Sequence, residues 1–514
     1  MIKIDGHSLD IANLYRLIFE GYYMYVDKDA LAKVDESHRF LRDFAANKLI
    51  YGINTGFGPM AQYRIDETEL LNLQYNIIRS HSSGMNEYLE KDYAKAVLIN
   101  LLNSMLGGYS GVHTDLIHII VAMIIEDITP CIPLHGGVGA SGDLVQMAHV
   151  ALNIIGEGEV FCGDTIMPAA DAFRLKSINP LKISLREGIA IMNGTTAMTA
   201  VAALNVCRAT IALEWSLALS ACLNDMMQSY DDHYSERLNI VRQQSGQLVI
   251  AYILSEFLED SKRIKSRERL YGQTVEENHI EDKVQPFYSL RCIPQILGPV
   301  HDTLDYARKI VENELNSTTD NPIVDVETKN VYHGGNFHGD YISLEMDKLK
   351  LVMTRVGMLA ERQLNYLMNP AINGCLRPFL NSETLGLNFG FQGIQFTATS
   401  TAAENQALST SNYVHSIPNN NDNQDIVSMG FNAACAAKKV IDNVFEILAI
   451  QAAAVIQGID MLSCKDELST KNQKIYTDLR DVFAPLDGDR ATRNDLMKLK
   501  EFMMFNSLQI FFEK

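Results

Sequence analysis

The sequence lacks the patterns from which redox and metal centres are built. Its 514 residues include eight cysteines, and no two of them have the C-x-x-C spacing of redox and zinc motifs. No group of His, Cys and Asp has the spacing of metal ligands, so we expect no metal. Cysteines scattered in apolar text behave as small hydrophobic residues and fit a reducing compartment, which predicts a cytoplasmic protein.

Basic residues are also scarce. The chain has 44 Lys and Arg against 63 Asp and Glu, a net charge of −19. Proteins that bind nucleic acid usually carry a basic face, so nucleic acid is not an expected partner. An anionic substrate would need a locally positive site within this acidic chain, which directs attention to single buried arginines.

Signals for membrane attachment are absent as well. The first residues, Met1 to His7, do not have the basic and then apolar layout of a signal peptide. The most apolar stretch, residues 195–223, is rich in Ala, Ser and Thr and contains Arg208 and Glu214. Such text predicts a buried core helix and not a membrane span.

Glycine, by contrast, is concentrated in one stretch, Gly136 to Leu144, with the sequence GGVGASGDL. Within it the Gly142 nitrogen can attack the Ala140 carbonyl carbon and close a five-membered ring. Loss of water from that ring and from the Ser141 side chain leaves an exocyclic methylidene, which is a strong electrophile. The tight turn that this needs suits glycine, because glycine tolerates unusual dihedrals. Taken alone, the same text is also typical of a plain glycine-rich turn that leads into a helix at Asp143.

The text around this triplet resembles the aromatic amino acid ammonia-lyases, a family of histidine, phenylalanine and tyrosine ammonia-lyases and related aminomutases. The central match is Gly-Ala-Ser-Gly-Asp-Leu followed by Gly-Glu-Gly at residues 156–158. Five further segments occur in the family's order: YGINTGFG at 51–58, MNGT at 192–195, YSLRC at 288–292, GGNFH at 334–338 and NQD at 423–425. One such motif is weak support, but six in order leave little room for chance.

The resemblance implies a mainly α fold. This would be a long-helix bundle of the fumarase/aspartase-like superfamily, with a loop-rich N-terminal part that carries the autocatalytic electrophile. We expect domains at residues 1–195 and 196–514. Following the family, we also expect a homotetramer in which each active site is shared between subunits. The implied cofactor is 4-methylidene-imidazol-5-one, formed from Ala140, Ser141 and Gly142, with no metal and no diffusible cofactor.

Hydrophobic spacing independently predicts long helices. Apolar residues recur at alternating steps of four and three from Tyr341 to Met368, which is the seam of a packed bundle helix. The text from Ala436 to Leu462 is apolar nearly all round, which predicts a central, buried helix. The charged text at residues 259–283 predicts an exposed helix and loop.

The resemblance also assigns the reacting groups. The ring would take up the substrate's amine, and Tyr51 would remove the β-proton as general base. Arg291 matches the family's carboxylate-binding arginine, and the planar fork of a guanidinium suits a carboxylate. Tyr288 matches a second tyrosine near the electrophile.

Polar and glycine positions complete the implied site. Asn193 would donate a hydrogen bond to the ring's oxygen, as in an oxyanion site. Asn336 would contact the carboxylate, and Phe337 would press the triplet towards cyclisation. Further substrate-binding positions are implied at Gly58 in a mobile loop, Gln285 and Gln424.

Two positions bear on the substrate, and they disagree. Ser80-His81 stands where histidine lyases also carry Ser-His, and it favours a polar ring. Gln424, however, replaces the glutamate that holds the imidazole in histidine lyases, and an amide loses the charge-assisted hydrogen bond to an imidazolium. His81 could instead hydrogen-bond a phenol hydroxyl. We therefore rank an ammonia-lyase that converts L-tyrosine to p-coumarate first, a urocanate-forming histidine lyase second and a phenylalanine lyase third.

Other classes of protein stay open to different degrees. An aromatic 2,3-aminomutase would carry the same residues and differ only in returning the ammonia to the β-carbon. A non-catalytic helical protein is disfavoured, because the Ala-Ser-Gly triplet and Tyr51 are both intact.

Overall fold

The structure is a computed structural model that describes residues 1–46, 48–271 and 283–511. The chain divides into two compact units, each assembled from three segments. The first contains residues 1–207, 307–347 and 411–438, and the second contains residues 208–306, 348–410 and 439–514. The division expected at residue 195 follows the chain continuously, whereas these two units interleave along the sequence.

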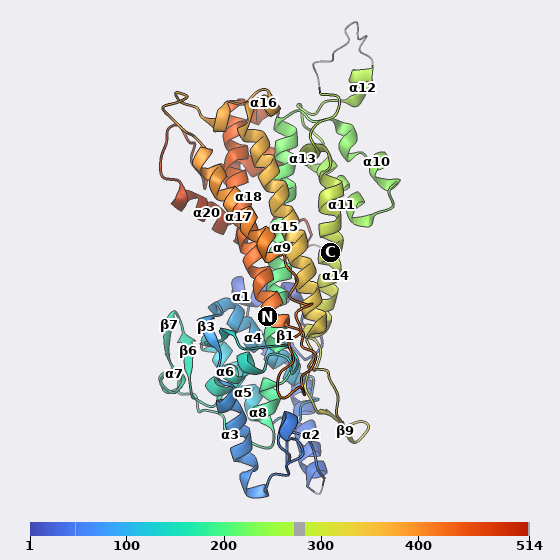
Figure 1. Cartoon of the computed structure of the whole chain (residues 1–514), viewed down its shortest axis with the longest axis vertical. Helices are drawn as coiled ribbons and strands as arrows, with labels where there is room; N and C mark the ends of the chain where they lie inside the picture. Colours follow the sequence, from blue (N-terminus) through green and yellow to red (C-terminus); the bar gives the residue numbers. More distant parts are fainter. Residues whose placement is uncertain (47, 272–282, 512–514) are drawn as a thin grey trace. The chain divides into compact units, whose positions relative to one another are not determined.

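The first unit is built from short helices and short strands (Figure 1). Its helices are α1 (Ile11–Phe19), α2 (Lys28–Ala45), α3 (Leu70–His81), α4 (Lys91–Leu106), α5 (Thr114–Ile125), α6 (Leu144–Ile154), α7 (Ala169–Leu175) and α8 (Glu187–Met192). Its strands are β1 (Ile2–Ile4), β2 (Met24–Val26), β3 (Met85–Tyr88), β4 (Ile128–Pro130), β5 (Pro133–His135), β6 (Glu159–Cys162), β7 (Thr165–Pro168), β8 (Ile323–Asp325) and β9 (Asn330–Tyr332). They form four small sheets in the orders β1-β2, β3-β5, β4-β6-β7 and β8-β9, of which only β1-β2 is parallel.

Four long helices begin in one unit and end in the other: α9 (Thr196–Met226), α14 (Ile293–Leu315), α15 (Asp340–Met368) and α18 (Gly430–Met461). The second unit adds α10 (Glu236–Ile240), α11 (Ser245–Leu258), α12 (Arg267–Tyr271), α13 (Tyr288–Arg291), α16 (Pro370–Asn373), α17 (Gln392–Leu408), α19 (Thr470–Arg480) and α20 (Arg493–Phe505). Of the predicted exposed segment at 259–283, residues 272–282 lie outside the described residues.

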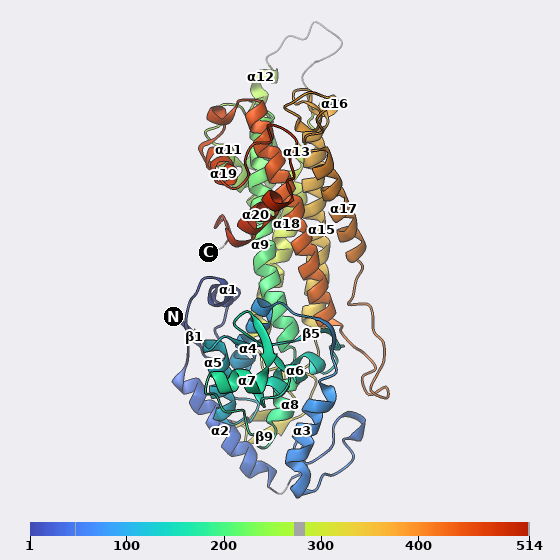
Figure 2. The same cartoon turned by 90° about the vertical axis from the view of Figure 1, so that its left-hand side faces the viewer.

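The helices of the second unit pack side by side as a bundle, which Figure 2 shows for α15, α17 and α18. Buried polar side chains connect them. Gln363 Nε2 donates to Ser220 Oγ at 2.9 Å, and Gln451 Nε2 donates to Gln363 Oε1 at 2.5 Å. Asn443 Nδ2 donates to Asn405 Oδ1 at 2.8 Å. Because buried amides are costly unless they are paired, these bonds fix the register of the helices.

The predicted long helices are confirmed. The helix expected from Tyr341 to Met368 is α15, and the one expected from Ala436 to Leu462 is α18, which begins earlier. Helices α9 and α18 are long and apolar enough to span a membrane, but their most apolar windows are 100% and 83% buried inside the protein. That burial is expected of core helices.

A small apolar cluster anchors the loop that carries Tyr51. Ile50 and Ile53, on either side of it, are buried against Val324 and Val331 of the β8-β9 hairpin. Gln74 of α3 is also buried, and its Nε2 donates to Gly52 O at 3.0 Å. The base of this glycine-rich loop is therefore fixed by packing and by a hydrogen bond.

The single tryptophan supports the bundle. Trp215 of α9 is buried, and its Nε1 donates to Met503 O at 3.0 Å and to Asn506 O at 2.9 Å at the end of α20.

We expect Trp215→Phe to lower the free energy of unfolding by about 1–3 kcal/mol, because it leaves these carbonyls without their donor. Circular dichroism during urea unfolding measures this. Tyr252→Phe, at an exposed aromatic residue, is the control and should change little. Equal stability of the two variants would contradict the docking role of the indole.

Candidate functional site

A cavity of about 610 Å³ lies within the first unit. It collects side chains from segments that are far apart in the sequence. Eight of the residues predicted for the site line it: Tyr51, Gly58, Ser80, His81, Ser141, Asn193, Phe337 and Gln424. The structure therefore brings these eight positions together around one cavity, and their roles stay predictions.

The Ala-Ser-Gly triplet lies against the segment that follows α8. Gly142 and Gly194 form a parallel bridge, in which the Asp143 amide donates to Gly194 O at 2.8 Å and the Gly194 amide donates to Ser141 O at 3.4 Å. Neither bond uses the Gly142 nitrogen, the atom that is expected to attack in cyclisation. The bridge thus holds the residues on either side of Gly142, and the Gly142 nitrogen takes no part in its hydrogen bonds.

The residues present fit the ring that the resemblance implies. Gly142 has a φ of +66°, which favours glycine, and a Cβ at this position would collide with the Gly194 carbonyl oxygen. Gly139, on the other side, has a φ of +79°. Ser141 faces the cavity, and Gln424 Nε2 donates to its hydroxyl oxygen at 2.9 Å. A tight turn with glycine at both ends therefore presents the serine that would lose its hydroxyl.

Asp143 lies behind the triplet in a fully buried position. Asp143 is the N-cap residue of α6, but its side chain makes no capping bond. Its Oδ2 instead accepts from the Met198 amide at the start of α9 at 2.7 Å. Burial raises the pKa of Asp143 to about 7, although the amide donors of Met198 and Ala197 oppose the shift. Glu314, whose charge also raises that pKa, accepts from Thr195 Oγ1 at 2.6 Å.

Tyr51 is fixed at its phenolic oxygen by its own loop. The Gly58 amide donates to this oxygen at 3.2 Å, and the Phe57 ring packs edge-on at 6.0 Å between ring centroids. Gly58 has a φ of +53°, and a Cβ there would lie 2.9 Å from Asn420 Nδ2. A glycine at this position therefore brings the loop backbone within reach of the tyrosine oxygen.

Ser80 and His81 lie at the end of α3 and face the cavity. The His81 Nδ1 lies 3.0 Å from Ile77 O and 3.0 Å from Ser80 Oγ. Because a carbonyl oxygen only accepts, this contact places the hydrogen on Nδ1. In a neutral imidazole the acceptor is then Nε2, which suits a ligand that donates an O–H.

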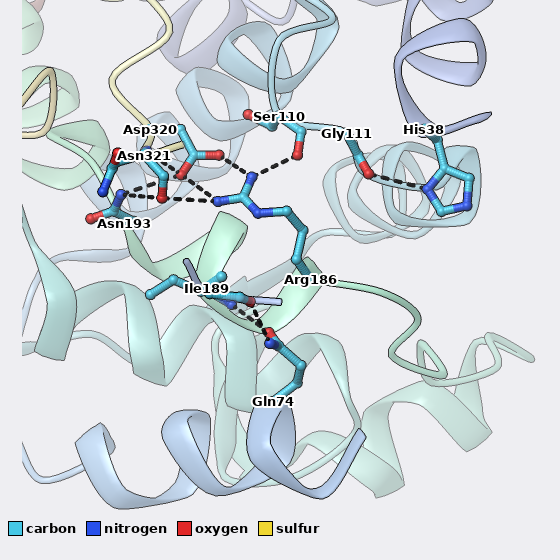
Figure 3. A network of polar contacts seen from close by, with 10 residues as sticks. His38, Gln74, Ser110, Gly111, Arg186, Ile189, Asn193, Asp320 and Asn321 are labelled. Carbon is cyan, nitrogen blue, oxygen red and sulfur yellow. Dashed lines mark hydrogen bonds and ion pairs between the residues drawn. The ribbon is translucent and has the colours of Figure 1, made fainter. Parts of the chain in front are cut away.

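Asn193 belongs to a buried polar network (Figure 3). Its Nδ2 donates to Asp320 Oδ1 at 3.2 Å and to Asn321 O at 3.4 Å. Asp320 also accepts two hydrogen bonds from Arg186, whose side chain is wholly buried. The expected donation from Asn193 to the ring's oxygen stays a prediction.

Six predicted residues are not among those that line this cavity. Two of them, Ala140 and Gly142, flank Ser141 in the chain, and the other four lie elsewhere. Asn336 is exposed in the loop before Phe337, and Gln285, Tyr288 and Arg291 belong to the second unit. Tyr288 is 69% exposed, and the Arg291 guanidinium lies 4.8 Å from its ring centroid. Arg291 Nε is buried without a hydrogen-bond partner among the described residues. An arginine in this state is suited to an incoming anion.

Sequence reasoning missed several residues around the cavity. Asn321, Asn420 and Asn423 line it, and Arg186 and Asp320 lie directly behind Asn193. The asparagines occur in segments whose sequence is typical of turns. No sequence pattern indicates that Arg186 pairs with Asp320, which lies 134 residues later. Among the described residues, no group of three His, Cys, Asp or Glu side chains lies close enough to hold a metal ion.

Comparisons with known proteins agree over nearly the whole chain. A sequence profile described as aromatic amino acid lyase matches residues 9–481. A probable histidine ammonia-lyase of Thermoplasma volcanium is 35% identical, covering 99% of each chain. The tyrosine ammonia-lyase of Cupriavidus metallidurans is also 35% identical, covering 96% of this chain and 94% of the relative.

Solved structures support the same relationship. The crystal structure of tyrosine aminomutase from Streptomyces globisporus has a TM-score of 0.94 to this structure at 33% sequence identity, covering 99% of this chain and 98% of that chain. The expected mainly α, fumarase/aspartase-like fold is thereby confirmed.

The raised pKa of Asp143 predicts a pH-dependent stability. A carboxyl with a pKa of 3.8 unfolded and about 7 folded stabilises the protein when protonated, and this contribution is lost as the pH rises through that window. Within this window the free energy of unfolding changes by at most about 1.4 kcal/mol per pH unit. In the Ser141→Ala background, where no ring can form, we expect the Tm to increase between pH 7.5 and 5.5 relative to Ser141→Ala/Asp143→Asn. Parallel Tm curves for the two proteins would show that Asp143 does not titrate here.

Proposed function

The chain belongs to the aromatic amino acid lyase family, and on that premise we propose that it is an ammonia-lyase that converts L-tyrosine to p-coumarate and ammonia. It is an enzyme of a family of carbon–nitrogen lyases and aminomutases. The observation that carries the proposal is the cavity in which Ser141, Tyr51 and His81 face a common space. We propose a cytoplasmic location on the grounds of the cysteine pattern.

The electrophile in this proposal is 4-methylidene-imidazol-5-one, formed autocatalytically from Ala140, Ser141 and Gly142. When formed, this group supplies an electron sink that makes the substrate's amine a leaving group. The glycine turn and the Gly142–Gly194 bridge support its formation here. The Gln424 amide, 2.9 Å from Ser141 Oγ, would steady the serine before dehydration.

Tyr51 is the base in this proposal. As the phenolate, its oxygen would take the β-proton and become the neutral phenol, while the C–N bond breaks with its electron pair leaving on nitrogen and the C=C bond of the product forms. The Gly58 amide fixes that oxygen at 3.2 Å. A base must be held within hydrogen-bond reach of the proton that it removes, and this loop supplies that position. Closing the loop over the cavity would also exclude water.

His81 favours tyrosine among the three amino acids. With its hydrogen on Nδ1, a neutral His81 offers Nε2 as an acceptor for a phenol hydroxyl. Phenylalanine would leave that acceptor unpaired, which is costly in a closed cavity. Gln424 lacks the negative charge that would hold an imidazolium. Histidine and phenylalanine lyase activity, and an aromatic 2,3-aminomutase activity, are the alternatives.

The carboxylate of the substrate requires a cation, and this points to a shared site. No Arg or Lys is among the described residues that line the cavity, whereas Arg291 has a buried Nε without a partner. We propose that the protein is a homotetramer in which Arg291 and Tyr288 reach the cavity of another subunit. Tyr341, Leu344 and Leu351 recur on one face of α15 and are 41–67% exposed, which supplies an apolar surface for subunit contact.

The function is tested by mass and by product analysis. We expect the purified protein to have a mass two waters below that of its sequence and to release ammonia and p-coumarate from L-tyrosine faster than the products from histidine or phenylalanine. Ser141→Ala should keep the full sequence mass and lose most activity, and treatment with a chelator should change nothing. Formation of β-tyrosine would instead assign an aminomutase. Near-normal turnover by Ser141→Ala would exclude the electrophile.

The shared site is tested by mixing two inactive proteins. Tyr51→Phe removes the base, and Arg291→Ala removes the carboxylate ligand, so each tetramer alone should lose activity by several orders of magnitude. If the two residues come from different subunits, dissociating and reassembling the two variants together should restore part of the activity. The control is each variant reassembled alone. Failure to recover activity at any mixing ratio would place both residues in one chain.

A further inference from the structure

The amide of Asn193 is oriented by two groups that can only accept hydrogen bonds. Its Nδ2 lies 3.2 Å from the Asp320 carboxylate and 3.4 Å from the Asn321 carbonyl oxygen. Turning the amide over would place its oxygen against these two acceptors, which is repulsive. Figure 3 shows the amide oxygen directed away from both. Asn193 therefore has one orientation as long as Asp320 is a carboxylate.

Asp320 is itself held with little freedom. Arg186 donates from Nη1 to Asp320 Oδ2 at 2.6 Å and from Nη2 to Asp320 Oδ1 at 3.0 Å. The same guanidinium donates to Ser110 O at 2.6 Å and to Asn321 O at 3.1 Å. The two charged side chains are 0% and 2% exposed. A pair at this depth gains little net stability over apolar residues, so its value is expected in the geometry that it imposes.

The neighbours of Asp320 hold the backbone that follows Asn193 and the loop before Phe337. Thr319 Oγ1 accepts from the Thr195 amide at 3.1 Å, and Gly194 lies so close to Thr319 that a Cβ would be 2.5 Å from this oxygen. Asn321 Oδ1 accepts from the Gly334 amide at 3.0 Å, in the loop that leads to Phe337. Residues 319–321 are thus the rear support of two loops that face the cavity.

We propose that Asp320, fixed by Arg186, is a positioning residue that sets the orientation of the Asn193 amide towards the cavity. Asp320 does not line the cavity, so its effect on the ligand must pass through Asn193. The proposal rests on the proposed function only in the choice of ligand. It predicts that the effects of changing residues 193 and 320 are coupled, because neighbours that act through one another are not additive.

The test is a double-mutant cycle on binding that needs no ring and no turnover. In the Ser141→Ala background, isothermal calorimetry measures the Kd of p-coumarate, or of the corresponding arylacrylate if the active enzyme prefers another amino acid. We expect Asn193→Ala and Asp320→Asn each to weaken binding by about tenfold. We expect Asn193→Ala/Asp320→Asn to bind no more weakly than Asn193→Ala alone. Additive losses, or no loss for Asp320→Asn, would overturn the proposal.

Controls separate positioning from general damage. Asp320→Asn leaves the Arg186 charge unpaired and can weaken folding, so Arg186→Met/Asp320→Asn removes both charges and should show the same coupling to Asn193. Asp225→Asn is the matched control in the second unit. It alters another buried carboxylate, which accepts from Ser469 N and Asn472 Nδ2 at 2.8 Å each, and should lower the Tm without changing the Kd.

The ring-bearing forms give an independent measurement. Asp320→Asn on its own should still show the loss of two waters by intact mass, because Gly142 is held by Gly194 and not by Asp320. Its kcat should fall about tenfold or more, again without adding to Asn193→Ala. If the wild-type enzyme is active but the losses caused by Asn193→Ala and Asp320→Asn are additive, only the positioning role is refuted. A wild-type protein that releases ammonia from none of the three amino acids refutes the proposed function alone, and the calorimetric cycle still decides the role of Asp320.

Discussion

The close approach of the backbones at Gly142 and Gly194 is the constraint on which the candidate site depends. A side chain at either position would collide with the facing segment, the carbonyl of Gly194 in one case and Thr319 in the other. Three segments that are far apart in the sequence therefore stack directly on one another. The triplet is at the front of this stack, Asn193 is in the middle, and residues 319–321 are at the back. Helices α6 and α9 both begin from it, so the position of the triplet is tied to the start of a long buried helix.

Around this stack, the protein accepts groups that are costly to bury. Asp143, Glu314, Asp320 and Arg186 are all buried or nearly so, and each has specific partners. Such groups contribute less to stability than apolar residues of similar size. They do, however, permit few arrangements, because every donor and acceptor must be matched. A site that must hold a reacting triplet in one geometry benefits from this restriction.

The match between sequence and structure is uneven for physical reasons. Hydrophobic spacing located α15 and α18 well, because a helix that packs in a bundle must repeat its apolar residues. The glycines at 139 and 142 indicated a tight turn in the sequence, because few residues other than glycine adopt the left-handed backbone conformation that both have in the structure. Asp143 is the N-cap residue of α6, but its side chain makes no capping bond. Its side chain bonds to α9, a helix that starts 53 residues later, and no local pattern contains that partner.

The sequence by itself indicated the family, located the long helices and predicted eight of the residues that line the cavity. It also pointed to the Ala-Ser-Gly triplet as the origin of the electrophile. Each of these features corresponds to a motif or to a periodic pattern in a continuous stretch of sequence. Only the tertiary structure decided that residues 319–321 support Asn193, that His81 Nδ1 faces the Ile77 carbonyl oxygen, and that Arg291 belongs to a different unit from Tyr51. These features depend on which carbonyl or carboxylate faces a given side chain. The network at Asn193 joins segments 127 residues apart, and the His81 contact runs to a carbonyl four residues earlier in its own helix. No motif or periodic pattern in the sequence encodes either contact.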